Sequence, residues 1–293
     1  MDIEGTKDGG VALSVLTAVI MAGGRGRRAG DPEKCMWPLC GVPLLFRVAG
    51  ALAQVAARVV VLTTPAHRRV AKYAAEWGLE VVYTPGEGYE KDFLHAARLA
   101  PAVVAACDLA NLSPGHVEKL LAHGVFTTAV TQGGYPGLSY LPTPRLDRWA
   151  DVDVGALFDV DTPEDLERAE EECPVAYPLY VPTSKLRPHE DVLEERPYQR
   201  VWPIAVDYKT GVILDGHHRF AFLKKLGVAP VLLFDYDVVD VNVDKRAVVE
   251  AAATGRLMPP KTTWHTYKGR HISQIPTVEV PVDYLTRRLP RDA

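Results

Sequence analysis

Apolar and polar positions change along the first half of the chain in blocks that predict strands and helices in turn. The stretch from Thr17 to Ala22 is almost wholly apolar, which predicts a strand buried on both faces. Beyond it, strand patterns cover 58–62, 80–83 and 103–107, and helical patterns cover 44–55, 66–77 and 91–99. This alternation predicts an α/β fold with a mostly parallel sheet and helices on both of its faces.

A glycine- and arginine-rich loop, 23–30, follows the first strand. Glycines let a backbone approach a phosphate closely, and arginines add charge-assisted donors. The glycine spacing fits neither the dinucleotide fingerprint nor a Walker loop. An anion-binding loop is favoured over a merely flexible one.

Asp108 directly follows the predicted strand 103–107, which places it at the carboxyl edge of the sheet beside the glycine loop. A carboxylate next to phosphates suggests a Mg²⁺ ligand, although Asp108 as a cap on the next turn is the alternative. Further on, a strand is expected to end at Phe158, and Thr162 is expected to cap a helix. Asp159 and Asp161 would add a second carboxylate or, as slightly favoured, only start that helix.

A second motif with polar chemistry lies in the other half of the chain. The apolar run Val212–Leu214 ends in Asp215-Gly216-His217-His218-Arg219, and a helical pattern begins at Phe220. Backbone N–H groups, two imidazoles and a guanidinium would then meet at one anion site, most naturally a phosphate site. The alternative is a hairpin-like turn in which Asp215 caps a helix and the cationic side chains are solvated. Around this motif, strands are expected at 202–206 and 231–236, a helix at 245–253, and a proline-stiffened loop at 258–265.

Length and composition limit the class of protein. A chain of 293 residues suggests two domains, and 24% charged with 47% hydrophobic residues is ordinary for a globular protein. The acidic run that ends at Pro174 suggests a boundary there, giving domains 1–174 and 175–293. The net charge of −4 argues against a dedicated nucleic-acid binder. No apolar run is long enough for a membrane span. The apolar stretch that begins at Val11 lacks a basic leader, so we expect a strand rather than a signal peptide.

The four cysteines show no metal-ligand spacing and no disulfide framework. They are Cys35, Cys40, Cys107 and Cys173. We expect them to be reduced, in a cytoplasmic protein.

The loop after the first strand, with Glu33-Lys34 and Pro38-Leu39, resembles the signature loop of molybdopterin-guanylyltransferase-like nucleotidyltransferases. Within that superfamily, residues 17–172 are most similar to the archaeal GTP:adenosylcobinamide-phosphate guanylyltransferases, with support from 86–92, 107–112 and 159–166. The resemblance implies a Rossmann-like domain that uses GTP. It assigns the triphosphate to the glycine loop and Arg28, charge neutralisation during pyrophosphate displacement to Lys34, and metal binding to Asp108. The loop glycines concerned are Gly23, Gly24 and Gly26.

Three motifs of the second half, 186–190, 214–219 and 259–265, resemble the free serine kinases built on the ParB/sulfiredoxin fold. The resemblance implies a smaller α+β domain. It makes Glu190 the general base toward the amino acid hydroxyl and places Asp215 in the catalytic or Mg²⁺ shell. The residues implied to hold the nucleotide phosphates are Gly216, His217, His218, Arg219, Lys261, Thr262 and Thr263.

Together the two resemblances suggest a bifunctional transferase of cobalamin nucleotide-loop assembly. One half would guanylylate a corrinoid phosphate, and the other would phosphorylate free L-threonine or L-serine with ATP or ADP, both with Mg²⁺. We expect small-molecule substrates and neither a nucleic-acid nor a membrane partner; the oligomeric state stays open. The alternative is a non-catalytic ParB-like nucleotide sensor acting on DNA or a partner, with the first domain as scaffold. The proline-broken segment 272–293 carries no helix-turn-helix pattern, which disfavours that alternative.

Overall fold

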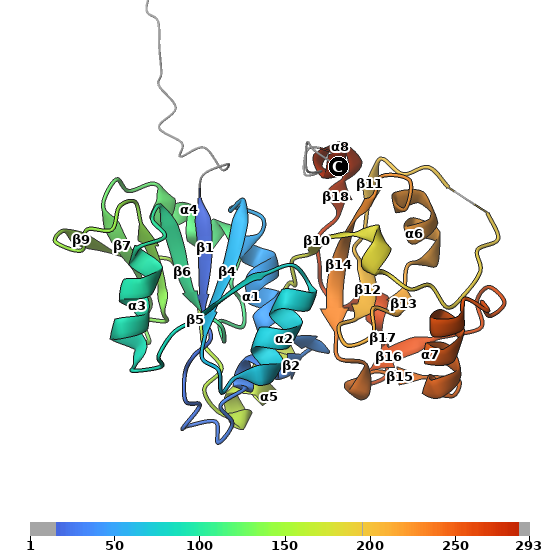
Figure 1. Ribbon diagram of the computed structural model, residues 1–293. Helices are drawn as coiled ribbons and strands as arrows, with labels where there is room; N and C mark the ends of the chain where they lie inside the picture. Colours follow the sequence, from blue (N-terminus) through green and yellow to red (C-terminus); the bar gives the residue numbers. More distant parts are fainter. Residues whose placement is uncertain (1–15, 195, 287–293) are drawn as a thin grey trace, which may run out of the picture.

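The computed structural model describes residues 16–194 and 196–286 (Figure 1). The first half is built on a seven-stranded sheet. Its strands are β1 (Thr17–Met21), β4 (Arg58–Thr63), β5 (Glu80–Tyr83), β6 (Ala102–Ala106), β7 (Phe126–Val130), β8 (Leu138–Leu141) and β9 (Trp149–Asp153). They lie in the order β5-β4-β1-β6-β8-β7-β9, and only β8 runs antiparallel to its neighbours. The expected mostly parallel sheet is confirmed.

Helices cover both faces of this sheet. They are α1 (Leu44–Leu52), α2 (Arg68–Glu76), α3 (Tyr89–Ala97), α4 (Pro114–Leu121) and α5 (Pro163–Glu172). Along β1, Val19 and Met21 join a buried apolar cluster with Ala96 of α3, whereas Ala18 and Ile20 join the cluster that contains α1, α2 and α4. Because β1 is buried on both faces, its sequence is continuously apolar rather than alternating.

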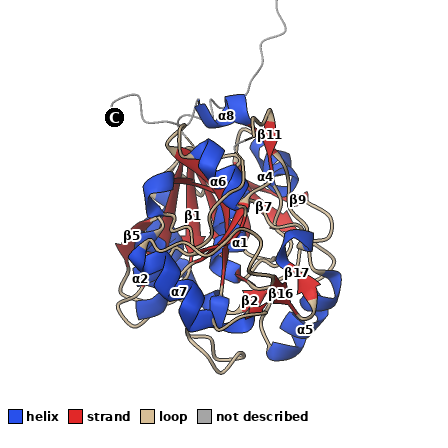
Figure 2. Cartoon of the chain, turned by 90° about the vertical axis from the view of Figure 1, so that its right-hand side faces the viewer, coloured by secondary structure: helices blue, strands red, loops and turns tan. Residues whose placement is uncertain are grey.

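The second half forms a mixed sheet of four strands in the order β10-β14-β12-β13. These are β10 (Leu179–Pro182), β12 (Ile204–Asp207), β13 (Ile213–Asp215) and β14 (Val228–Phe234). Helices α6 (His217–Leu223) and α7 (Lys245–Thr254) lie on the side away from the first half (Figure 1). Both views place α6 above α7 (Figure 2).

Short elements complete the chain. A three-stranded sheet holds β15 (Asp240–Val241), β16 (His265–Tyr267) and β17 (Arg270–His271), while β2 (Pro38–Leu39) pairs with β3 (Val42–Pro43) and β11 (Arg200–Val201) with β18 (Val280–Pro281). Helix α8 (Val282–Thr286) and the 3-10 turns η1 (Lys34–Met36), η2 (Thr183–Lys185), η3 (Tyr236–Val238) and η4 (Ile272–Gln274) are the rest.

The two halves pack closely against each other. One cluster of buried apolar side chains runs from α1 and the β2–β3 hairpin into the second sheet. At Gly50, inside α1, a Cβ would come within 1.9 Å of the Tyr177 carbonyl oxygen. The Trp77 indole N–H donates to the Tyr208 carbonyl at 2.8 Å. A domain boundary at 174 stays a prediction, although each half has its own sheet.

Several expectations differ from the structure. Helix α4 and strands β7 to β9 were not anticipated, and no strand ends at Phe158, where Leu109 and Asp159 form only an isolated bridge. Helix α6 begins at His217 rather than at Phe220, so both histidines of the motif are helical. The expected strand start at Val11 and the part of the tail beyond Thr286 lie outside the described residues.

The expectation of four reduced cysteines is wrong. The structure pairs Cys35 with Cys107 and Cys40 with Cys173 as disulfides, with Cα atoms 5.6 and 5.9 Å apart. The partners are 72 and 133 residues apart in sequence. Only the fold brings them together, so their spacing along the chain gave no signal.

Among residues 16–194 and 196–286, no helix combines the length and apolar character needed to cross a membrane.

Candidate functional site

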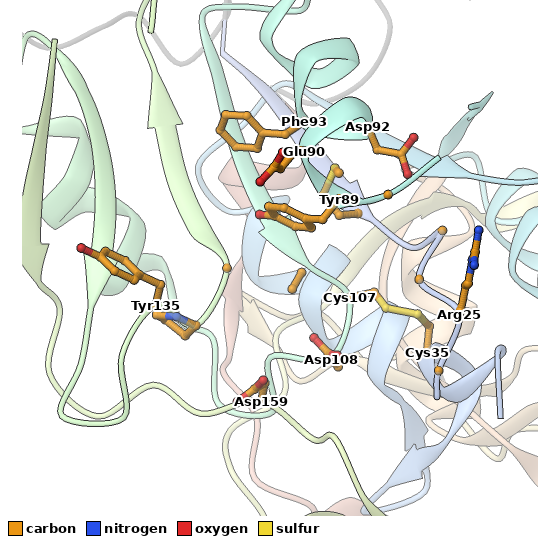
Figure 3. A pocket seen from close by; sticks show the side chains of 18 of the residues that line it. Arg25, Cys35, Tyr89, Glu90, Asp92, Phe93, Cys107, Asp108, Tyr135 and Asp159 are labelled. Atoms are coloured by element: carbon orange, nitrogen blue, oxygen red, sulfur yellow. A yellow bond between two sulfur atoms is a disulfide. The ribbon is translucent and has the colours of Figure 1, made fainter. Parts of the chain in front are cut away.

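A cavity of about 1180 Å³ opens at the carboxyl edge of the seven-stranded sheet (Figure 3). Its walls come from the loop after β1, the start of α3, the loop after β6 and the residues just before α5, together with β7, β8 and the loop that joins them. Ligand pockets for small molecules typically hold about 300–1,000 Å³, so this one has room for a nucleotide and a second molecule. The six residues of the first half that the sequence placed at a site all line it: Gly23, Gly24, Gly26, Arg28, Lys34 and Asp108.

Lys34 lies at the centre of the polar part of the cavity. Its Nζ is 2.6 Å from Asp108 Oδ2, 2.8 Å from Asp161 Oδ1 and 3.0 Å from the Val160 carbonyl oxygen. Burial by itself lowers the pKa of Lys34, but the two carboxylates outweigh burial and raise that pKa above its usual value. Lys34 therefore carries its charge at any physiological pH.

Two carboxyl groups near Lys34, those of Asp159 and Asp161, have pKa values shifted in opposite directions. Burial, followed by the negative charges of Asp161 and Asp108, raises the pKa of Asp159. Burial acts in the same direction on Asp161, but contacts with Lys34 and Arg28 reverse the balance and lower its pKa. Arg28 lies 2.5 Å from Asp161 and is mostly exposed. Of the two alternatives for Asp161, the structure therefore favours membership of the site.

The residues flanking the Lys34–Asp108 pair are covalently joined. Cys35 follows Lys34, Cys107 precedes Asp108, and their disulfide lies at the wall of the cavity (Figure 3). The bond holds the loop after β1 against the end of β6. It restricts how far the ammonium and the carboxylate can separate.

A second polar cluster connects the motifs of the other half. Glu190 accepts hydrogen bonds from the Thr263 N–H and hydroxyl, both at 2.6 Å, and from the Lys261 N–H at 3.2 Å. The His189 N–H donates to His217 Nε2 at 3.3 Å, which joins α6 to the same cluster. The structure therefore brings together three sequence motifs that lie up to 73 residues apart.

Three histidines in this cluster are buried. The ring of His189 lies 4.5 Å from that of His217 and 5.7 Å from that of His265, which contacts the Tyr236 hydroxyl at 3.1 Å. Burial and the neighbouring imidazoles lower the pKa of His217 well below its usual value, and that of His265 to about 3. His217 is thus neutral and adds no positive charge.

The remaining motif residues lie around the start of α6 and, for Thr262, in the loop 259–263. Asp215 pairs with Arg219 at 2.5 Å, and Gly216 between them adopts a φ of +107°. A Cβ at Gly216 would come within 2.8 Å of the Arg219 guanidinium, so glycine leaves room for this pair. His218 contacts the Glu194 carbonyl oxygen, and Thr262 donates to the Pro259 carbonyl.

Comparison with known proteins shows the family to which the chain belongs. Residues 18–200 match the MobA-like NTP transferase domain family. The chain belongs to this family. The match covers more than half of the chain and includes every residue around the cavity, so the cavity is the site of a nucleotidyltransferase domain.

Individual relatives are more distant. A ParB-like protein of Sulfolobus acidocaldarius is 37% identical over 75 residues, which are 22% of this chain and 38% of that protein's length. A nucleotidyl transferase from Methanothermobacter thermautotrophicus is 19% identical over 54% of this chain and 97% of its own, with a TM-score of 0.45. The inositol-1-phosphate CTP transferase from T. maritima is 14% identical over 56% and 99%, with a TM-score of 0.43.

Sequence reasoning gave no role to several acidic residues of the nucleotidyltransferase cavity, Glu87, Glu90 and Asp92 among them, and undervalued Asp161. Asp92, on α3, lines the cavity, yet in the sequence it is one acidic residue in the first turn of an amphipathic helix. Asp161 was weighed as a helix-start residue, because Thr162 does cap α5, as expected, through the Asp165 N–H. The Asp-Val-Asp pattern before that cap was the available signal.

Proposed function

We propose that the nucleotidyltransferase domain transfers a guanylyl group from GTP to adenosylcobinamide phosphate. The observation that carries this proposal is the contact of Lys34 with Asp108 and Asp161 beside a glycine- and arginine-rich loop. The choice of guanine and of the corrinoid acceptor comes from the resemblance of residues 17–172 to guanylyltransferases of that type.

In this reaction a phosphate oxygen of the acceptor attacks the α-phosphorus of GTP. A new P–O–P bond forms, the bond to the β-phosphate breaks, and pyrophosphate leaves. Lys34 and Arg28 stabilise the negative charge that builds up on the phosphate oxygens. The backbone of the glycine loop positions the triphosphate. No acid or base is needed on the attacking phosphate, which is already ionised.

Carboxylate oxygens near the triphosphate suit Mg²⁺, which commonly binds one or two carboxylates plus phosphate oxygens. Asp108 Oδ1 is buried and has no hydrogen-bond partner within 16–194 and 196–286, which fits a ligand that supplies the missing contact. Described residues form no cluster of three or more metal-binding side chains. Asp108, with Asp161, would hold the ion, which would supply charge neutralisation at the phosphates.

The guanylyl-transfer proposal predicts a defined product. With GTP, Mg²⁺ and adenosylcobinamide phosphate, the protein is expected to release pyrophosphate and to form the GDP-linked corrinoid in equal amounts, measured by mass spectrometry and a phosphate assay. CTP and ATP in place of GTP serve as controls. Absence of the corrinoid product, or equal use of all nucleotides, would overturn the assignment.

We propose further that the second half phosphorylates free L-threonine or L-serine with ATP or ADP. The hydrogen bonds that join Glu190, Thr263 and Lys261 to the α6 motif support this proposal, together with the resemblance of these motifs to free serine kinases. The substrate hydroxyl would attack the terminal phosphorus of the donor, its proton would pass to Glu190, and the nucleotide with one phosphate fewer would leave.

The proposed role of Glu190 as general base can be tested separately from its role as anchor of the loop 259–263. Glu190→Gln keeps an acceptor oxygen for Thr263 but removes the basic group. We expect a loss of kcat of about 10²-fold or more with little change in the nucleotide KM, measured as O-phosphothreonine and O-phosphoserine formed. Glu194→Gln, on an exposed side chain, is the matched control. A parallel loss of nucleotide binding would indicate anchoring alone. No phospho amino acid with wild type would reject the kinase and favour a nucleotide sensor.

A further inference from the structure

We propose that Asp92 reads the base of the donor nucleotide and selects guanine through its N1–H and 2-amino groups. The inference rests on the proposed function, in that the cavity binds a nucleoside triphosphate. Asp92 lies in the first turn of α3 and is only 6% exposed, yet it lines the cavity (Figure 3).

One oxygen of the Asp92 carboxylate has no donor among the described residues. This oxygen, Oδ1, is buried. Burying a carboxylate oxygen without a donor is costly, and folded proteins rarely leave one in that state. At the wall of a binding cavity, such an atom points to a donor on the ligand.

Several glycines line the same cavity as Asp92. The Asp92 Oδ2 lies 3.5 Å from where a Cβ on Gly23 would be, and Gly86 and Gly88 also line the cavity. At Gly86, whose φ is +68°, a Cβ would come within 2.8 Å of the Thr64 methyl carbon. Position 86 therefore requires glycine, and at Gly23 and Gly86 the lining of the cavity is backbone without a side chain.

Asp92 lies beside Gly23 of the glycine loop but takes no part in the contacts of Lys34 and Arg28 with Asp108 and Asp161. In Figure 3 it lies on the other side of the Cys35–Cys107 disulfide from Asp108 and Asp159. If Lys34 and Arg28 hold the phosphates, the nucleoside would lie farther from Asp108, on the side of the cavity where Asp92 is. A carboxylate repels phosphates, so its partner on a nucleotide has to be a donor on the base or sugar.

Among the common bases, guanine presents the matching pair of donors. Its N1–H and 2-amino group lie side by side, and a carboxylate accepts both with its two oxygens. Adenine and uracil have no two adjacent donors on that edge, and cytosine offers only its amino group. The geometry points to Asp92 as a specificity-determining residue.

The test exchanges one acceptor for a donor. Asp92→Asn turns one side-chain oxygen into an amide N–H, which fits xanthine, whose N1–H lies beside a carbonyl at position 2. Wild type is expected to prefer GTP to ITP about 10-fold or more and to XTP still more strongly, because each charge-assisted hydrogen bond contributes about that much. In Asp92→Asn, kcat/KM for XTP is expected to exceed that for GTP. Glu118→Gln, on the exposed side of α4, controls for an unrelated loss of charge.

Direct measurement of nucleotide binding distinguishes a failure of base selection by Asp92 from a failure of the proposed guanylyl transfer. Calorimetric Kd values for GTP, ITP and XTP report base selection even if no corrinoid product forms, in which case only the function fails. If Asp92→Asn does not fold, the wild-type series still decides: equal Kd values for GTP and ITP overturn the proposal. An unchanged GTP preference in Asp92→Asn also overturns it. A third outcome also overturns the proposal. If Asp92→Asn no longer discriminates between GTP and 2′-deoxy-GTP, Asp92 contacts the ribose and not the base.

Discussion

At the scale of single residues, the nucleotidyltransferase cavity pairs its own charges before any ligand enters. Lys34 bridges Asp108 and Asp161, and Arg28 also contacts Asp161. A triphosphate brings negative charge that competes with these carboxylates for the same cations. In the proposed reaction, binding would exchange one set of ionic contacts for another and would leave Asp108 available to the proposed Mg²⁺.

The buried histidines make the second half sensitive to acid. The pKa of His265 is lowered to about 3 in the folded protein, whereas an unfolded histidine titrates near about 6.5. The unfolded chain thus binds the additional proton first, and stability falls as pH drops below about 6.5, by about 1.4 kcal/mol per pH unit for each such group.

Replacing one of these histidines should reduce the acid sensitivity. In His265→Gln we expect the free energy of unfolding to fall less steeply between pH 6.5 and 4.5. The difference in slope should be about 1.4 kcal/mol per pH unit, which corresponds to one proton. Urea unfolding at stepped pH measures it, and His123→Gln, on an exposed side chain, is the control. Identical slopes in wild type and His265→Gln would contradict the assigned burial.

At the scale of elements, much of the first sheet follows from the sequence. The apolar run of β1 and the alternating patterns before Asp108 gave the parallel strands and α1 to α3 in order. Strands β7 and β9 escaped notice because they mix apolar and polar positions; β9 is the edge strand, and β7 lies next to it. Helix α6 begins earlier than its apolar period because the buried His217 fills a core position that hydrophobicity alone does not mark.

Helix α1 shows how tightly elements of the two halves meet. In an exposed helix, Gly→Ala gains up to about 1 kcal/mol from propensity. At Gly50 the new methyl group would meet the Tyr177 carbonyl at 1.9 Å, so we expect Gly50→Ala to destabilise the protein by about 1–3 kcal/mol. Gly115→Ala in α4, whose Cβ would have its nearest neighbour 3.8 Å away, is the matched control. A Gly50→Ala protein as stable as wild type would contradict the packing.

At the scale of the whole molecule, the two halves are joined by contacts that the sequence did not reveal. Glu170, near the end of α5, accepts from the Cys40 N–H, the Tyr267 hydroxyl and Lys268. The same helix begins just after Asp161, so it extends from the nucleotidyltransferase cavity to the second half. Such links depend on side chains that are distant in sequence, as do the disulfides and the position of Asp92. Motifs could indicate the residues of each site, but not their neighbours.

The two sites proposed for this chain predict two separable losses of function. Lys34→Ala removes charge stabilisation at the first site, where a single such group is commonly worth about 10²-fold or more in rate. It leaves the Glu190 cluster intact. Glu190→Gln should reduce phosphorylation of the amino acid and leave guanylyl transfer unchanged.

The most direct test of the account is the product spectrum of wild type, Lys34→Ala and Glu190→Gln, each given GTP, ATP, Mg²⁺, L-threonine and adenosylcobinamide phosphate. The account predicts that wild type forms the GDP-linked corrinoid and phosphothreonine, that Lys34→Ala forms only phosphothreonine, and that Glu190→Gln forms only the corrinoid product. Undiminished guanylyl transfer by folded Lys34→Ala would contradict it.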